Sequence, residues 1–122
     1  MSRAFFEAYY HTYNREDPEA LRAFYHDELE LRSSQGVLRG AEAVLDTYRQ
    51  LIRQFRDQMT AEHISVSDGR VQVRIRNQFT AKCPVADFMG QSLAAGESMS
   101  LSLMASYQLR DGKIYRAEIT VL

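Results

Sequence analysis

Alternation of apolar and polar residues is clearest in the segment Val71-Gln72-Val73-Arg74-Ile75-Arg76-Asn77-Gln78-Phe79. Successive side chains of a strand point to opposite faces of a sheet, so the odd-numbered residues are expected to share one face. The glutamines and arginines between them share the other face. The segment therefore predicts a long strand with one apolar face, interrupted by a single amide at Asn77.

Turn signals on both sides extend this strand into a meander. Asp68-Gly69 precedes it and Asp111-Gly112 follows a second alternating run, residues 99–109. Asp-Gly suits a tight hairpin because glycine tolerates positive φ. A last strand is expected from Ile114 to Leu122. The connection 83–98 is expected to be irregular, and two interpretations of residues 85–95 are open: a mobile lid over a pocket, or a hairpin extension that packs on a second subunit.

The first half of the chain has helical spacing instead. Apolar residues between positions 3 and 14 cover more than one helix face, and Asp17-Pro18 is a strong signal for the start of a second, short helix ending near Asp27. Residues 29–33 alternate as a short strand. An amphipathic third helix is predicted from Ala41 to Phe55. Helices followed by an antiparallel meander predict an α+β fold in which the helices pack in a strongly curved sheet around a conical interior.

Composition limits the class of protein. The 122 residues fit a single domain, 1–122, and the net charge is -1. A balanced charge gives no field for nucleic acid or an anionic membrane, so neither is expected as a partner. No apolar run is long enough to span a bilayer, and the N-terminal residues do not read as a signal peptide, so a cytoplasmic location is predicted. A lone Cys83 and three histidines without ligand spacing predict no metal, and no cofactor is expected.

A family resemblance is carried by the order of residue types along the whole chain. The residues are Tyr9, Asn14, Asp17-Pro18, Leu21, Phe24-Tyr25, Asp27, Gly36, Gly40-Ala41, Val44, Tyr107 and Asp111-Gly112-Lys113-Ile114. This order resembles the nuclear-transport-factor-2-like superfamily, and within it the SnoaL-like and ketosteroid-isomerase-like branch. The resemblance implies a cone-shaped α+β barrel, a deep pocket and commonly a homodimer formed through the outer sheet faces.

The ketosteroid isomerases of that branch use a tyrosine on the first helix and two aspartates on strands. The resemblance places Tyr9 at the tyrosine position, Ser33 at the position of the base and Ala105 at that of the second acid. Ser33 and Ala105 cannot hold these charges. Steroid isomerisation by that mechanism is therefore not expected, and whether the protein is an enzyme stays open.

Tyr9 is the candidate catalytic residue, because a hydroxyl in a dry pocket can donate to a substrate oxygen. Packing in the core is the alternative for Tyr9 and for Tyr13, and aromatic residues at helical spacing favour it. Asn77 needs a hydrogen-bond partner, which is either a ligand or a loop carbonyl or water. We expect the polar atoms of Asn77 and Tyr9 to meet in one confined space. The predicted ligand-binding wall comprises Tyr13, Leu31, Ser33, Val73, Ile75, Asn77, Leu103 and Tyr107.

Four ionisable residues have an orientation that the pattern does not fix: Glu7, Glu30, His63 and Glu118. One inward carboxylate would favour catalysis. His63 alternates with Ile64 and Val66, which points its ring to the face opposite theirs, whereas a general-base role would need the ring in the pocket.

Two functions follow. The first is binding of a small hydrophobic ligand, with an isomerase-, cyclase- or hydratase-like reaction on it as the finer hypothesis. The alternative is a non-catalytic interaction or scaffold module that uses the outer sheet face, where Arg74 and Arg76 lie. A homodimer through outer sheet faces is expected in either case, because Ser100, Ser102 and Ser106 on the outer face of residues 99–109 permit close approach.

Overall fold

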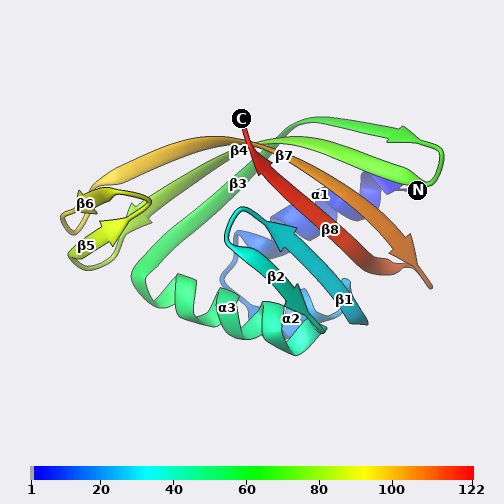
Figure 1. Ribbon diagram of the computed structural model, residues 1–122, viewed down its shortest axis with the longest axis horizontal. Helices are drawn as coiled ribbons and strands as arrows, with labels where there is room; N and C mark the ends of the chain where they lie inside the picture. Colours follow the sequence, from blue (N-terminus) through cyan, green and yellow to red (C-terminus); the bar gives the residue numbers. More distant parts are fainter. Residues whose placement is uncertain (1) are drawn as a thin grey trace.

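A sheet that arches over three helices makes up most of the computed structural model, which describes residues 2–122 (Figure 1). The helices are α1 (Ser2–Tyr13), α2 (Pro18–Arg22) and α3 (Ala41–Gln54). The strands are β1 (Tyr25–Ser33), β2 (Gly36–Arg39), β3 (Phe55–Ser67), β4 (Arg70–Ala81), β5 (Val85–Phe88), β6 (Gln91–Leu93), β7 (Ser98–Arg110) and β8 (Lys113–Val121).

The main sheet has six strands in the order β2-β1-β8-β7-β4-β3, and β5-β6 form a separate hairpin. The meander from β3 to β8 is antiparallel, as the two Asp-Gly turns predict. Within residues 2–122, the β1–β8 pair alone is parallel. No hairpin turn joins these two strands, so local sequence carries no signal for their direction. The α+β class and the cone are confirmed, with a strongly curved sheet that does not close.

Burial follows the predicted alternation on β4. Val71, Val73, Ile75, Asn77 and Phe79 are all buried, whereas the residues between them are exposed. The helices fill the concave face of the sheet (Figure 1). Four aromatic residues of α1 are buried there, Phe6, Tyr9, Tyr10 and Tyr13. A helix with apolar residues on more than one face is buried on more than one side, which explains the pattern in the sequence.

Three tight turns share positive φ angles at both of their central residues. Asp68-Gly69 and Asp111-Gly112 have positive φ at both residues, as expected of their hairpins, and so does Met89-Gly90 (φ 52° and 83°). The last turn joins β5 to β6. The segment 83–98 is therefore not the irregular connection that was expected. It contains a hairpin anchored by the buried Leu93, which agrees with the hairpin interpretation of residues 85–95. The dipeptide Met-Gly is not a standard turn signal, so the sequence pattern did not locate the turn.

The ends of two helices also differ from the prediction. The second helix ends at Arg22, and Tyr25 already belongs to β1. The third helix ends at Gln54, and Phe55 is extended (φ -132°, ψ 146°) as the first residue of β3. Phe55 stands four residues after Leu51, a spacing typical of one face of a helix. It also stands two residues before the buried Asp57, a spacing typical of one face of a strand. Periodicity alone therefore could not locate this boundary.

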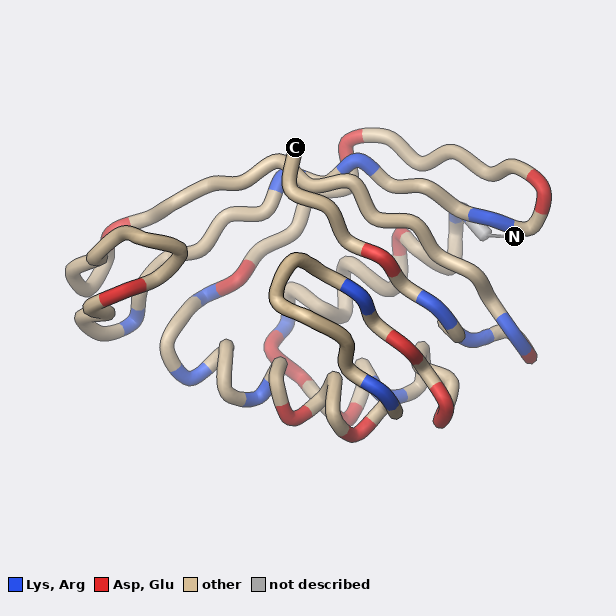
Figure 2. The backbone as a smooth tube through the Cα atoms, in the orientation of Figure 1, with Lys and Arg blue, Asp and Glu red and all other residues tan. Residues whose placement is uncertain are grey.

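Acidic and basic residues both occur on α2 and α3, and on α3 the acidic residues come before the basic ones (Figure 2). Arg22 pairs with Glu19 and Glu42, and Arg49 pairs with Glu19 and Asp46. Within residues 2–122, no helix is long and apolar enough to cross a membrane. No group of acidic, histidine or cysteine side chains in the same range has the arrangement of a metal site.

Candidate ligand-binding site

A cavity of about 430 Å³ opens at one end of the cone, between the sheet, α3 and the β5–β6 hairpin. Its wall is largely apolar and includes Leu51, Phe55, Phe79, Phe88, Leu101 and Leu103. Uncharged polar side chains line it as well, from the β1–β2 turn (Ser33, Ser34, Gln35) and from α3 (Thr47, Gln50, Gln54). A space of this size and lining suits a compact, mostly apolar molecule.

A smaller chamber of about 110 Å³ lies deeper in the cone, lined by Tyr9, Tyr25, Leu31 and Tyr107 among others. Tyr13, Leu51 and Met59 line both spaces. The inner chamber is thus separated from the outer cavity by a few side chains.

Asp57 is the charged residue of the outer cavity. It lies on the inward face of β3, and only 2% of its surface is exposed. The Tyr13 hydroxyl donates to Asp57 Oδ2 at 2.6 Å, and Asn77 Nδ2 donates to Asp57 Oδ1. The same Asn77 amide also donates to the Gln58 carbonyl at 3.2 Å. One carboxyl group is therefore held between α1 and β4 by two neutral donors.

The register of the sheet explains this arrangement. Asp57 pairs with Phe79, and Met59 pairs with Asn77, in the β3–β4 ladder. Asn77 is therefore the diagonal neighbour of Asp57 on the same face, within reach of a side-chain hydrogen bond.

Burial raises the pKa of Asp57 to about 6, although the hydrogen bonds from Tyr13 and Asn77 favour the ionised form and oppose the rise. Burial also raises the pKa of Tyr13 well above its usual value, and the neighbouring Asp57 charge adds to the rise. Tyr13 therefore stays protonated, and its hydroxyl donates a hydrogen bond to the carboxylate. A carboxyl that titrates near neutral pH at the wall of a cavity can take a proton from a ligand and return it.

Sequence reasoning missed Asp57. Helical spacing extends the predicted third helix to Phe55, which leaves Asp57 between the predicted elements. The signal was present: Phe55, Asp57 and Met59 alternate, and the polar position among them matches the polar Asn77 on the next strand.

The structure divides the predicted catalytic residue Tyr9 and the predicted ligand-binding residues among three places, with Tyr13 in the wall of two of them. Tyr13, Ser33, Asn77 and Leu103 line the outer cavity. The inner chamber is lined by Tyr9, Leu31 and Tyr107. Val73 and Ile75 are buried in the core and do not occur in the wall of either space.

Tyr9 and Asn77 belong to separate hydrogen-bonded pairs, contrary to the expectation that their polar atoms meet. The Tyr9 hydroxyl lies 2.8 Å from that of Tyr25, whereas Asn77 binds Asp57. A second tyrosine pair joins Tyr10 to Tyr107 at 2.7 Å. Tyr13, one turn beyond Tyr9, is the α1 hydroxyl that meets the buried carboxyl.

The four residues of open orientation lie outside this cavity. Glu7, His63 and Glu118 are exposed, and Glu30 pairs with Arg32 and Arg39. The inward carboxylate that would favour catalysis is thus Asp57 and none of these. Ala105 is fully buried and Ser33 lies at the cavity wall, so neither supplies a charge.

A family model described as a SnoaL-like domain matches residues 6–117. The chain belongs to the SnoaL-like family. This confirms the resemblance seen in the order of its residues. No curated protein matches the chain.

Several solved structures have the same fold as this SnoaL-like domain. A putative polyketide cyclase from Xanthomonas campestris has a TM-score of 0.82 and 23% identity, over 97% of this chain and 87% of that one. A SnoaL-like polyketide cyclase from Agrobacterium tumefaciens has a TM-score of 0.78 and 19% identity, over 97% and 88%. AclR, a putative hydroxylase from Streptomyces galilaeus, has a TM-score of 0.78 and 20% identity, over 98% and 74%. At these identities the likeness shows the fold.

Proposed function

We propose that this SnoaL-like protein binds a compact, largely apolar small molecule in the outer cavity and that Asp57 exchanges a proton with it. The observation that carries the proposal is the buried carboxyl of Asp57 at the cavity wall, held by Tyr13 and Asn77. A reaction of the isomerase, cyclase or hydratase class needs such a group, because each begins or ends with a proton transfer.

The proposed chemistry uses the environment of Asp57. Above pH of about 6 the carboxyl is ionised and can accept a proton from an acidic carbon or hydroxyl of the substrate. Tyr13 and Asn77 hold the carboxyl in one orientation, and the apolar wall keeps water from competing for the proton. Returning the proton to another carbon of the substrate gives isomerisation. Attack of the substrate anion on a carbonyl carbon of the same molecule breaks the carbonyl π bond and gives cyclisation, and the resulting alkoxide takes back the proton from Asp57.

Asp57 does not occupy either of the two aspartate positions that the ketosteroid-isomerase resemblance implies. Those positions hold Ser33 and Ala105, which cannot titrate. The proton acceptor proposed here lies on β3 instead. The names of two similar structures, both called polyketide cyclases, support a cyclase among the three reaction classes.

The test is ligand-induced stabilisation. Neutral hydrophobic small molecules that bind the cavity should raise the melting temperature of the protein. Asn77→Leu should change that shift, since it removes a donor to Asp57 in the cavity wall. Gln78→Leu, the same change on the exposed face of the same strand, is the matched control and should leave the shift unchanged. Equal shifts in all three proteins would reject the cavity as the binding site.

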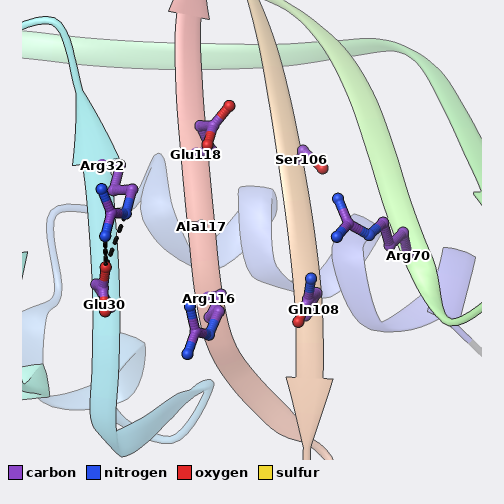
Figure 3. A pocket seen from close by; sticks show the side chains of 8 residues that line it. All are labelled: Glu30, Arg32, Arg70, Ser106, Gln108, Arg116, Ala117 and Glu118. Carbon is purple, nitrogen blue, oxygen red and sulfur yellow. Dashed lines mark hydrogen bonds and ion pairs between the residues drawn. The ribbon is translucent and has the colours of Figure 1, made fainter.

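The outer face of the sheet favours a second candidate function, an interaction module. A charged cleft of about 180 Å³ crosses β1, β8, β7 and β4 there. Figure 3 shows Arg116 and Glu118 on β8, with the Arg32–Glu30 ion pair on one side of them and Arg70 on the other side, beyond β7. Side chains of both signs on one open face suit contact with another polypeptide, including a second copy of this chain.

Two measurements separate these uses of the outer face. Sedimentation at micromolar concentration should give a dimer if the outer faces pair, and a single species of monomer mass would reject the homodimer. Capture of another polypeptide should be lost in the double variant Arg74→Glu, Arg76→Glu and retained in Asn77→Leu. The opposite pattern would reject the interaction module.

A further inference from the structure

The outer cavity has a negative charge without a counter-ion in its wall. Asp57 is buried, and its hydrogen-bond partners Tyr13 and Asn77 are both neutral. Among residues 2–122, no lysine, arginine or histidine lines this cavity. The ammonium group of Lys82, which follows β4 in the sequence, is bound to Glu16 and to the Ile52 carbonyl. A buried carboxylate is costly when no positive charge accompanies it.

Aromatic rings surround the same part of the cavity. Phe79 stands directly opposite Asp57 in the β3–β4 ladder, and Phe55 lies two residues before Asp57 on the same face. Phe88 of the hairpin packs on both, with ring centroids 4.4 Å from Phe55 and 4.9 Å from Phe79. All three line the cavity. Aromatic rings attract cations through the negative charge of their faces.

We propose that the ligand of this cavity is a small ammonium ion with apolar substituents, whose nitrogen lies beside the Asp57 carboxylate and against the phenylalanine rings. The inference rests on the proposed function and deepens it, because it names the charge of the molecule bound. The ligand supplies the counter-ion that the wall lacks, and its substituents contact Leu51, Met59 and Leu101. A neutral ligand would contact the same apolar wall but would leave the buried charge uncompensated.

Binding of such a cation depends on the ionisation of Asp57. The titratable groups that face this carboxyl are Tyr13 from α1 and Tyr48 from α3, and both stay neutral because burial raises their pKa. Asn77 from β4 does not titrate. A bound cation favours the ionised carboxylate and lowers its pKa. Affinity for the cation should therefore rise with pH through about 6, and binding below that pH should release a proton.

The experiment compares choline with its neutral carbon analogue, dimethylbutanol, in which a tert-butyl group replaces the trimethylammonium group. Dissociation constants are measured by calorimetry at pH about 7.5 and about 5, on either side of the pKa of Asp57. We expect choline to bind about tenfold more tightly than the alcohol at the higher pH, and the ratio to fall toward one at the lower pH.

Two variants test the carboxylate. Asp57→Asn keeps the shape of the side chain and removes its charge, so the two ligands should bind it with equal affinity. Glu28→Gln removes the same charge from an exposed side chain of β1 and should keep the preference for choline. A third variant, Phe88→Leu, should weaken choline several-fold more than it weakens the alcohol, since only the cation interacts with the ring face.

The outcomes separate this inference from the function on which it rests. Binding of the alcohol as tightly as choline, or a preference for choline that survives in Asp57→Asn, would overturn the ammonium ligand while leaving a small-molecule site. Failure of choline to bind at millimolar concentration would overturn it as well. If neither these probes nor neutral hydrophobic molecules bind, the proposed function fails with it.

Discussion

The carboxyl of Asp57 is buried on the inward face of the sheet. The inward residues of the neighbouring strand β4 are apolar, except for Asn77. Two neutral donors reduce the cost of that burial without cancelling it, so the pKa of the group rises to about 6 rather than falling below its usual value. A charge kept at such a cost in the wall of a cavity is characteristic of functional sites.

Replacement of this carboxyl should change the pH dependence of stability. The folded-state pKa of Asp57, about 6, lies above its usual value of 3.8, so the folded protein holds the proton to higher pH than the unfolded chain does. The resulting stabilisation is present below pH 3.8 and is lost as the pH rises through about 6. Relative to Asp57→Asn, the native protein should lose about 2 to 3 kcal/mol over this range.

Urea denaturation of both proteins at a series of pH values measures this difference. Other ionisable groups contribute equally to the two curves, so they cancel. Parallel curves between pH of about 4 and about 7 would show that Asp57 has an ordinary pKa.

Tyr13→Phe should destabilise the protein in a pH-dependent way. The change removes one of the two donors to Asp57, at a cost of about 1 to 2 kcal/mol when the carboxyl is ionised and less when it is protonated. Thermal unfolding above and below pH 6 measures the difference. Tyr10→Phe is the control on the same helix, because its hydroxyl meets that of Tyr107 and no carboxyl. A pH dependence of the same size in both variants would contradict the role of Tyr13.

At the scale of the elements, the strands were easier to predict than their surroundings. The alternation of residues 71–79 is unambiguous, and burial on β4 follows it residue by residue. Phe55 satisfies helical and strand spacing at once, so the start of β3, and Asp57 with it, could not be placed from periodicity. The parallel pairing of β1 with β8 joins distant segments and has no local signal. The wall residues Asn77 and Leu103 were predictable because they lie on strands whose register a hairpin fixes.

The β5–β6 hairpin should control access to the cavity, since Phe88 and Met89 belong to its wall. Gly90 has φ of 83°, in the left-handed region, with open space around its Cα. Gly90→Ala should therefore strain the turn by about 1 kcal/mol without a steric clash. We expect weaker ligand binding with little loss of global stability, measured by calorimetry and by urea denaturation. Unchanged ligand affinity together with a strained turn would show that the hairpin does not contribute to binding.

At the scale of the whole molecule, α1 links the sheet to the rest of the core. The ring of Phe6 is fully buried and stacks on Tyr107 of β7 at 4.6 Å, while Tyr13 of the same helix reaches β3. Tyr48 of α3 donates to the Tyr13 carbonyl at 2.5 Å, which ties the two long helices together. The position of Asp57 relative to the cavity thus depends on the packing of the entire cone.

Phe6→Ala should test this dependence. Removal of a fully buried aromatic ring costs about 3 to 5 kcal/mol, a large part of the stability of a domain of this size. Urea denaturation should show one cooperative transition at lower denaturant. Val66→Ala, at a side chain that is 53% exposed, should change stability by less than about 0.5 kcal/mol. Similar losses in the two variants would argue against the core role of α1.

The most direct measurement is an NMR titration of the Asp57 side-chain carboxyl in the protein with and without a ligand of the cavity. We predict a midpoint near pH 6 in the free protein and a clear displacement of that midpoint when the ligand is bound. A midpoint close to 3.8 that no ligand displaces would contradict the placement of Asp57 at a functional cavity.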